Sequence, residues 1–151
     1  MAIISDKDRE AIRRHFDANL TGDVEIVFFT ERPTLIVIPG RQQCETCEDT
    51  EKLLSEVASL SDKIALKVHE ISNSAAEAAE YDIDRVPAFV LKGANKGRVR
   101  FFGIPSGHEF SAFIADIVGV SSGVSGLTAA TIEYLSTLSE DVNLKVFTTP
   151  T

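Results

Sequence analysis

Cys44 and Cys47 are the only two cysteines of the 151-residue chain, and they lie between two different periodic patterns. The apolar run at 35–38 precedes them, is bounded by prolines and is too short for a helix, so it predicts a strand. The residues after the pair show the spacing of one helix face, formed by Leu53, Leu54, Val57 and Leu60. The sequence therefore predicts that Cys44 lies at the start of a helix that runs to about residue 60. A C-x-x-C between a strand and a helix is typical of a redox-active dithiol.

The remaining patterns alternate between strands and helices. Further helices are expected over 6–20, 74–81, 106–118 and 128–138, and further strands over 23–30, 64–68, 88–91, 99–102 and 141–148. The 92–97 loop contains two glycines and an asparagine, so its flanking strands should form an antiparallel hairpin. The order strand, helix, strand, helix predicts an α/β fold with a central mixed sheet flanked by helices.

Composition and charge limit the classes of partner. With 44% hydrophobic and 25% charged residues the chain resembles a soluble globular protein, and its formal charge of −8 disfavours nucleic acid and anionic membranes as partners. The N-terminus reaches acidic residues after two isoleucines and lacks the apolar run of a secretory signal, which favours a cytoplasmic protein. A closely spaced cysteine pair in a reducing compartment indicates redox chemistry or metal binding.

The expected position of the cysteines predicts their roles. A thiol at a helix N-terminus faces unpaired N–H groups and the positive end of the helix dipole, both of which favour the thiolate. Cys44 is therefore the predicted nucleophile, and Cys47, one turn further, the resolving thiol. The carboxylates of Glu45, Glu48, Asp49 and Glu51 oppose this effect, with Arg41 and Lys52 acting against them, although acids in a first turn are also ordinary partners of the dipole.

Zinc binding is the alternative chemistry for the two thiols. The site would be completed by two of His15, His69 and His108, which are far apart in the sequence, whereas structural zinc sites use paired spacings. We expect no metal and no cofactor. A further alternative is a redox-inactive interaction module of a two-unit protein.

The order of elements, with Val86-Pro87 opening the strand at 88–91, resembles the thioredoxin fold. More narrowly, five segments resemble the glutaredoxin-like protein disulfide oxidoreductases of archaea and bacteria: 5–8, 60–63, 83–88, 100–110 and 147–151. The N-terminal domain of the alkyl hydroperoxide reductase flavoprotein is similar too, including a stretch like 107–110.

This resemblance implies an enzyme that reduces, forms or exchanges protein disulfides. Cys44 would attack and Cys47 resolve, Pro87 would follow a cis peptide bond, and the backbone of Val86 would pair with an extended substrate segment. Proteins of this family are often reduced by a flavoprotein of the thioredoxin reductase type, which is the expected partner besides the protein substrates.

The C-terminal segment repeats an earlier pattern. Residues 141–148 match 23–30 at Asp, Val, Phe and Thr, and a predicted helix precedes each copy. Family members join two thioredoxin-fold units, each with its own C-x-x-C. We therefore expect 1–122 to be one such unit, and 123–151 to be the opening helix and strand of a truncated second unit. An apolar strand without its neighbours favours a homodimer that pairs through it.

Overall fold

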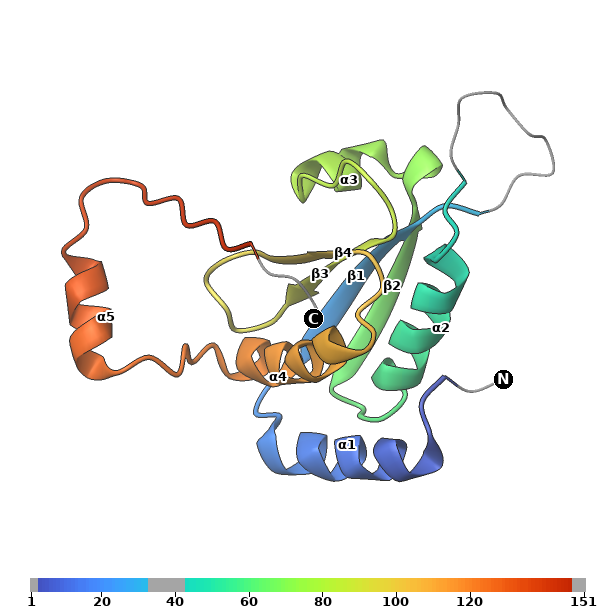
Figure 1. Ribbon diagram of the computed structural model, residues 1–151, viewed down its shortest axis with the longest axis horizontal. Helices are drawn as coiled ribbons and strands as arrows, with labels where there is room; N and C mark the ends of the chain where they lie inside the picture. The colour runs from blue at the N-terminus through green and yellow to red at the C-terminus, as the bar shows by residue number, and fades with distance from the viewer. Residues whose placement is uncertain (1–2, 33–42, 148–151) are drawn as a thin grey trace.

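A four-stranded mixed sheet with the order β2-β1-β3-β4 forms the centre of the computed structural model, which describes residues 3–32 and 43–147 (Figure 1). The strands are β1 Val24–Thr30, β2 Ile64–Glu70, β3 Ala88–Lys92 and β4 Val99–Phe102. β1 runs parallel to β2 and antiparallel to β3, and β3 and β4 form the predicted antiparallel hairpin. The predicted mixed sheet is confirmed.

Helices cover both faces of this sheet (Figure 1). They are α1 Asp6–Asn19, α2 Cys47–Ala58, α3 Ala75–Glu80, α4 His108–Ser122 and α5 Ala129–Ser136, with a 3₁₀ turn, η1, at Ile71–Asn73. Residues of α1, α2 and α4 pack on one face of the sheet, whereas α3 packs on the other. α5 lies apart from these layers (Figure 1).

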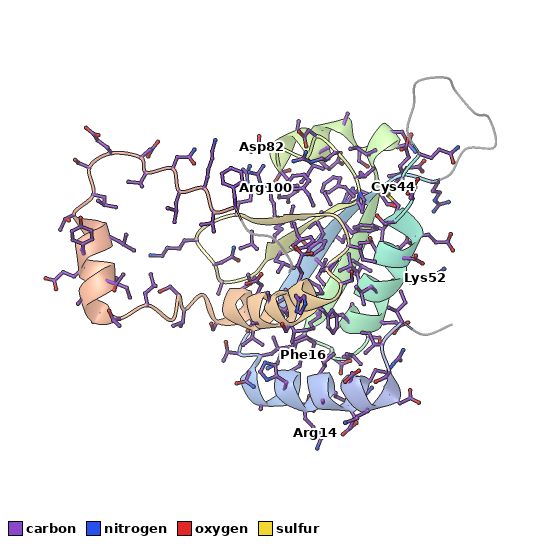
Figure 2. All side chains as sticks on the ribbon, in the orientation of Figure 1. Arg14, Phe16, Cys44, Lys52, Asp82 and Arg100 are labelled. Atoms are coloured by element: carbon purple, nitrogen blue, oxygen red, sulfur yellow. A yellow bond between two sulfur atoms is a disulfide. The ribbon has the colours of Figure 1, made fainter. Side chains whose placement is uncertain are left out.

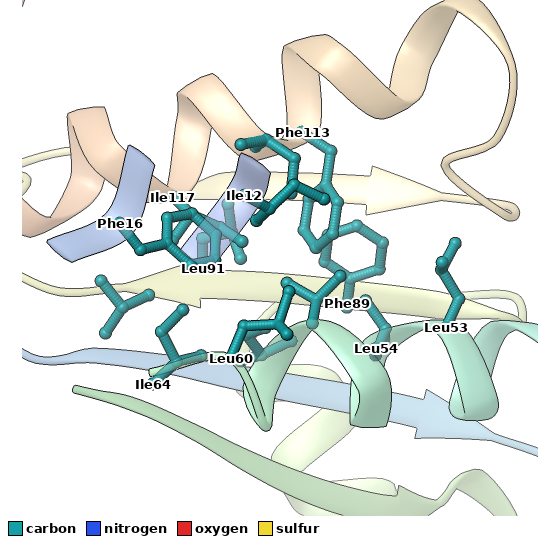
Figure 3. Close-up of a cluster of buried hydrophobic side chains, with 14 of the residues drawn as sticks. Ile12, Phe16, Leu53, Leu54, Leu60, Ile64, Phe89, Leu91, Phe113 and Ile117 are labelled. Atoms are coloured by element: carbon teal, nitrogen blue, oxygen red, sulfur yellow. The ribbon is translucent and has the colours of Figure 1, made fainter. Parts of the chain in front are cut away.

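β1 is one of the two inner strands of the sheet, and its side chains are buried on both faces. Ile26 and Phe28 point into the larger core with α1, α2 and α4, whereas Val27 and Phe29 point into the smaller core under α3. A strand buried on both faces is expected to be apolar throughout. Figure 3 shows the larger core, where the ring of Phe89 lies 5.1 Å from that of Phe113.

Side-chain caps begin two of the helices. The Ser5 hydroxyl accepts a hydrogen bond from the N–H of Asp8 (3.2 Å) at the start of α1, and the Thr128 hydroxyl accepts one from the N–H of Thr131 (3.2 Å) at the start of α5. Each bond satisfies one of the free N–H groups of a first helical turn.

The bounds predicted for α4 are wrong at both ends. Its N-cap is Gly107, without a side-chain bond, and the helix continues past residue 118, where we expected it to end, as far as Ser122. The extension is explained by tertiary contacts: Ser121 is buried, its hydroxyl accepts from the N–H of Thr21 (3.3 Å), and its carbonyl accepts from the Thr21 hydroxyl (3.3 Å). Gly123 then ends the helix in the left-handed conformation (φ 66°), where glycine is favoured.

The predicted strand at 141–148 is not formed in its described part, 141–147. No neighbouring strand pairs with this segment in the described sheet, and Val142, Leu144, Val146 and Phe147 are 71–91% exposed. A strand forms only where another strand satisfies its N–H and C=O groups. The strand predicted at 35–38, like Thr148, lies outside the described residues.

Candidate functional site

A disulfide joins Cys44 to Cys47 at the N-terminal end of α2, with an S–S distance of 2.01 Å and a Cα–Cα distance of 5.5 Å (Figure 2). The structure therefore brings together the two side chains that the sequence predicts to react. Both sulfurs are used by this bond, so neither is free to bind a metal in the oxidised protein.

The two cysteines differ in exposure. Cys47 is 2% exposed and is the first residue of α2, whereas Cys44 is half-buried and precedes the helix. The prediction that the helix begins at Cys44 is wrong because Thr46, its N-cap, has a non-helical backbone (φ −109°, ψ 1°). The carbonyl of Thr46 accepts the first helical bonds, from the N–H (2.9 Å) and the hydroxyl (2.7 Å) of Thr50. Cys44 still lies beside the N-terminus of α2, but in the turn before it.

Two of the acidic residues that follow the disulfide form ion pairs with a lysine. Lys52 Nζ lies 2.7 Å from Glu48 Oε1 and 4.0 Å from Asp49 Oδ1 on the exposed side of α2. The hydrogen bond from Lys52 lowers the pKa of Glu48, and the same bond raises the pKa of Lys52. These two carboxylates are therefore oriented toward a cation, which weakens the repulsion we expected between them and a thiolate. Arg41, the other expected counter-charge, lies outside the described residues.

Val86 and Pro87 lie across an open pocket from the disulfide and are joined by a cis peptide bond, as the resemblance implies. The pocket has a volume of about 670 Å³ and is lined by Glu31, Gln43, Cys44, Glu45, Thr46, Arg85, Val86 and Pro87. The carbonyl of Pro87 accepts from the N–H of Gly103 (2.8 Å). Within the described chain neither backbone group of Val86 has a hydrogen-bond partner, so both are available to a ligand.

The loop before Pro87 is attached to the edge strand β4 by contacts that sequence reasoning missed. Asp82 has a positive φ (51°), which is uncommon for a residue other than glycine, and its carboxylate pairs with Arg98 and Arg100 (Figure 2). Arg100 Nη1 also donates to the carbonyls of Tyr81 (3.2 Å) and Asp82 (3.1 Å). The alternation of Arg98 and Arg100 along the chain predicts that they share a face of the strand, but no local signal names Asp82 as their partner.

The three histidines are dispersed. The His15 ring lies 3.3 Å from the side-chain amide of Asn19, the His69 ring stacks on Phe29 with 5.4 Å between centroids, and His108 is the first residue of α4. Among residues 3–32 and 43–147, no group of three His, Cys, Asp or Glu side chains is placed to hold a metal ion. Over the same residues, no helix is long and apolar enough to cross a membrane.

Comparison with known proteins gives concordant matches. The family model described as thioredoxin domain matches residues 35–115. The F subunit of alkyl hydroperoxide reductase from Xanthomonas campestris pv. phaseoli is 31% identical over 134 residues, which are 87% of this chain but 23% of that protein.

Two solved structures resemble the chain in both sequence and fold. A protein disulfide oxidoreductase from Aeropyrum pernix K1 is 29% identical with a TM-score of 0.72, and the match covers 89% of this chain and 55% of that one. The F subunit of the alkylhydroperoxide reductase from Enterococcus faecalis is 26% identical with a TM-score of 0.72, covering 89% and 61%. The chain thus spans less than two thirds of the length of each of these relatives.

Proposed function

Because the chain belongs to the thioredoxin domain family, we propose that it is a thiol–disulfide oxidoreductase that reduces, forms or exchanges protein disulfides. The observation that carries this proposal is the Cys44–Cys47 disulfide, which has one accessible and one buried cysteine beside an open pocket. A pair of this kind can store and release two electrons through a mixed disulfide.

In the reducing direction the reaction begins with the dithiol form. The Cys44 thiolate attacks one sulfur of the substrate disulfide, that bond breaks, and the released substrate thiolate takes a proton. Cys47, deprotonated, then attacks the sulfur of Cys44, which reforms the protein disulfide and releases the second substrate thiol. Two electrons pass to the substrate, and oxidation of a substrate dithiol is the reverse. The burial of Cys47 supports its proposed role in the second step, because an external disulfide would reach Cys44 first.

We propose that Val86 and Pro87 bind the substrate next to the reacting sulfur. The unpaired backbone groups of Val86 can hydrogen-bond to an extended segment, as when a peptide adds a strand to a sheet edge. This interaction depends on the backbone, so it accepts many sequences and orients the substrate disulfide toward Cys44.

A flavoprotein of the thioredoxin reductase type is the proposed electron donor, and the cytoplasm the proposed location. The first follows from the resemblance, and two of the relatives are alkyl hydroperoxide reductase F subunits. The second is the location predicted from the sequence.

We further propose that residues 123–151 open a second thioredoxin-like unit beside the first unit, 1–122. The support is the repeat of the β1 sequence at 141–148 and the exposure of the apolar residues in the segment. Pairing with the same segment of a second molecule would cover these side chains and make the protein a homodimer.

The cysteine roles are tested with two matched serine variants. The protein should accelerate the reduction of insulin disulfides by dithiothreitol. Cys44→Ser should abolish this acceleration, because it removes the sulfur that attacks. Cys47→Ser should instead accumulate a mixed disulfide with the substrate, because nothing resolves the intermediate. Mass spectrometry of the trapped species is the measurement. Faster alkylation of Cys47 than of Cys44 in the reduced protein near neutral pH would contradict the assignment.

A further inference from the structure

The pocket beside the disulfide is lined by charged residues of both signs. Glu45 follows Cys44 in the chain and Arg85 precedes Val86, and Glu31, directly after β1, also lines the pocket. Arg85 is the only cationic side chain among the described residues that line the pocket. A carboxylate ligand in the pocket therefore has one cationic side chain to pair with among these residues.

The guanidinium of Arg85 is held by its flat face. Its central carbon lies 4.8 Å from the ring centroid of Phe102, a distance typical of a cation–π contact. The only ion-pair partner in the described chain is Asp84, with 3.6 Å between Arg85 Nε and Asp84 Oδ1, and the two side chains are 70% and 76% exposed. Such an exposed pair is strongly screened by solvent.

The terminal nitrogens of Arg85 are thus available for a ligand. No hydrogen bond from Nη1 or Nη2 is present within the described residues, and stacking on Phe102 uses the face of the group rather than its edge. The edge of a guanidinium offers N–H donors in the geometry that suits a carboxylate. An arginine held by a ring also loses less conformational freedom on binding than a freely moving one.

We infer that Arg85 is a specificity-determining residue that selects protein disulfides with an acidic residue near the reactive cysteine. This inference rests on the proposed oxidoreductase function and names its substrate class. The Val86 backbone holds the substrate segment, and the neighbouring Arg85 binds a substrate Asp or Glu side chain. Glu31 and Glu45 disfavour a carboxylate elsewhere in the pocket, so the acidic residue lies at Arg85.

The test compares three short peptides, each carrying a fluorescent thiol on its cysteine through a disulfide. They differ only in whether the residues flanking the cysteine are Glu, Gln or Lys. With the reduced full chain, we expect kcat/KM to fall in that order, with about a fivefold preference for Glu over Lys at low salt, set mainly by KM. The preference should shrink at high ionic strength. Arg85→Gln should abolish it, and Arg85→Lys should retain part of it.

Two further variants separate local recognition from other effects. Lys96→Gln changes the net charge by the same amount outside this pocket and should leave the preference intact. Phe102→Leu removes the aromatic ring under Arg85 and should weaken the preference, without adding to the effect of Arg85→Gln in the double variant. Thermal unfolding of each variant shows whether it is folded.

The outcomes distinguish the inference from the function on which it rests. Equal kcat/KM for the three peptides, or a preference that survives in Arg85→Gln, would overturn the role of Arg85 while the oxidoreductase function stands. Failure of the reduced wild-type protein to release the thiol from any peptide would instead overturn the proposed function.

Discussion

Glu56 of α2 shows how a single carboxylate holds two distant segments together. Its oxygens accept from the N–H groups of Ile3 (2.8 Å) and Ile4 (3.0 Å) and from Arg9 Nη2 (2.7 Å), and its side chain is 16% exposed. Burial alone would raise its pKa, but these three donors outweigh burial and lower the pKa below the ordinary value. The charged carboxylate therefore ties the start of the chain and α1 to α2.

Replacing this charge should cost stability in a pH-dependent way. Glu56→Gln is expected to lower the free energy of unfolding by about 1–3 kcal/mol at pH 7, because hydrogen bonds to a charged group are lost. Since the folded pKa lies below the unfolded one, the stabilisation is complete above the unfolded pKa and disappears as the pH falls through the folded value. Urea unfolding of the wild-type and variant proteins at pH 7 and pH 3 measures this difference in stability.

Glu51→Gln, on the same helix, is the control for the loss of one charge. It should change the free energy of unfolding less than Glu56→Gln at pH 7. If Glu56→Gln lowered the free energy of unfolding equally at both pH values, the link between the pKa of Glu56 and stability would be contradicted.

At the scale of elements, strand β4 supports the loop that carries Val86 and Pro87. Arg100→Gln should remove the bonds to the carbonyls of Tyr81 and Asp82 at the end of α3, as well as the ion pair with Asp82. We expect faster backbone hydrogen exchange in 81–87 and a loss of about 1 kcal/mol in stability. Hydrogen exchange measured by mass spectrometry resolves the segment.

Arg98→Gln is the matched control for Arg100→Gln. Arg98 pairs with the Asp82 carboxylate but makes no bond to a backbone carbonyl within the described chain, so its loss should affect exchange in 81–87 less. Equal effects of the two variants would show that the carbonyl bonds do not support the loop.

At the scale of the whole molecule, residues 124–147 carry several apolar side chains that are largely exposed. Leu127, Ile132, Leu135 and Leu138 are 44–51% exposed, and the apolar residues from Val142 onward are more exposed still. If this segment pairs between molecules, light scattering should give a dimer for the full chain and a monomer for a version that ends at Gly123. That version keeps all of α4 and its terminating glycine, so it should remain folded.

Ending the chain there leaves Val120 and Ser121, both buried, in place. The matched variant Leu144→Asp tests the same segment in a full-length chain and should also weaken association. A monomer for the full chain would contradict the homodimer, and a dimer that persists in the 1–123 version would place its interface elsewhere.

The amino-acid sequence by itself determined the features that depend on neighbouring residues. The strand β1 and the hairpin between β3 and β4 follow from patterns that span a few residues, because backbone bonds and side-chain periodicity act over that distance. The cysteine pair was found in the same way, from its spacing and its place before a helical pattern.

The tertiary structure alone decided features that depend on distant contacts. α4 extends to Ser122 because Thr21 binds Ser121, a hundred positions away, and the loop before Pro87 is held by Arg98, just before β4, and Arg100 within it. The placement of Arg85 over Phe102 is likewise a contact across the fold. The segment 141–147 gives the converse case: its strand pattern is local, but a strand also needs a partner, and none is present in the described chain.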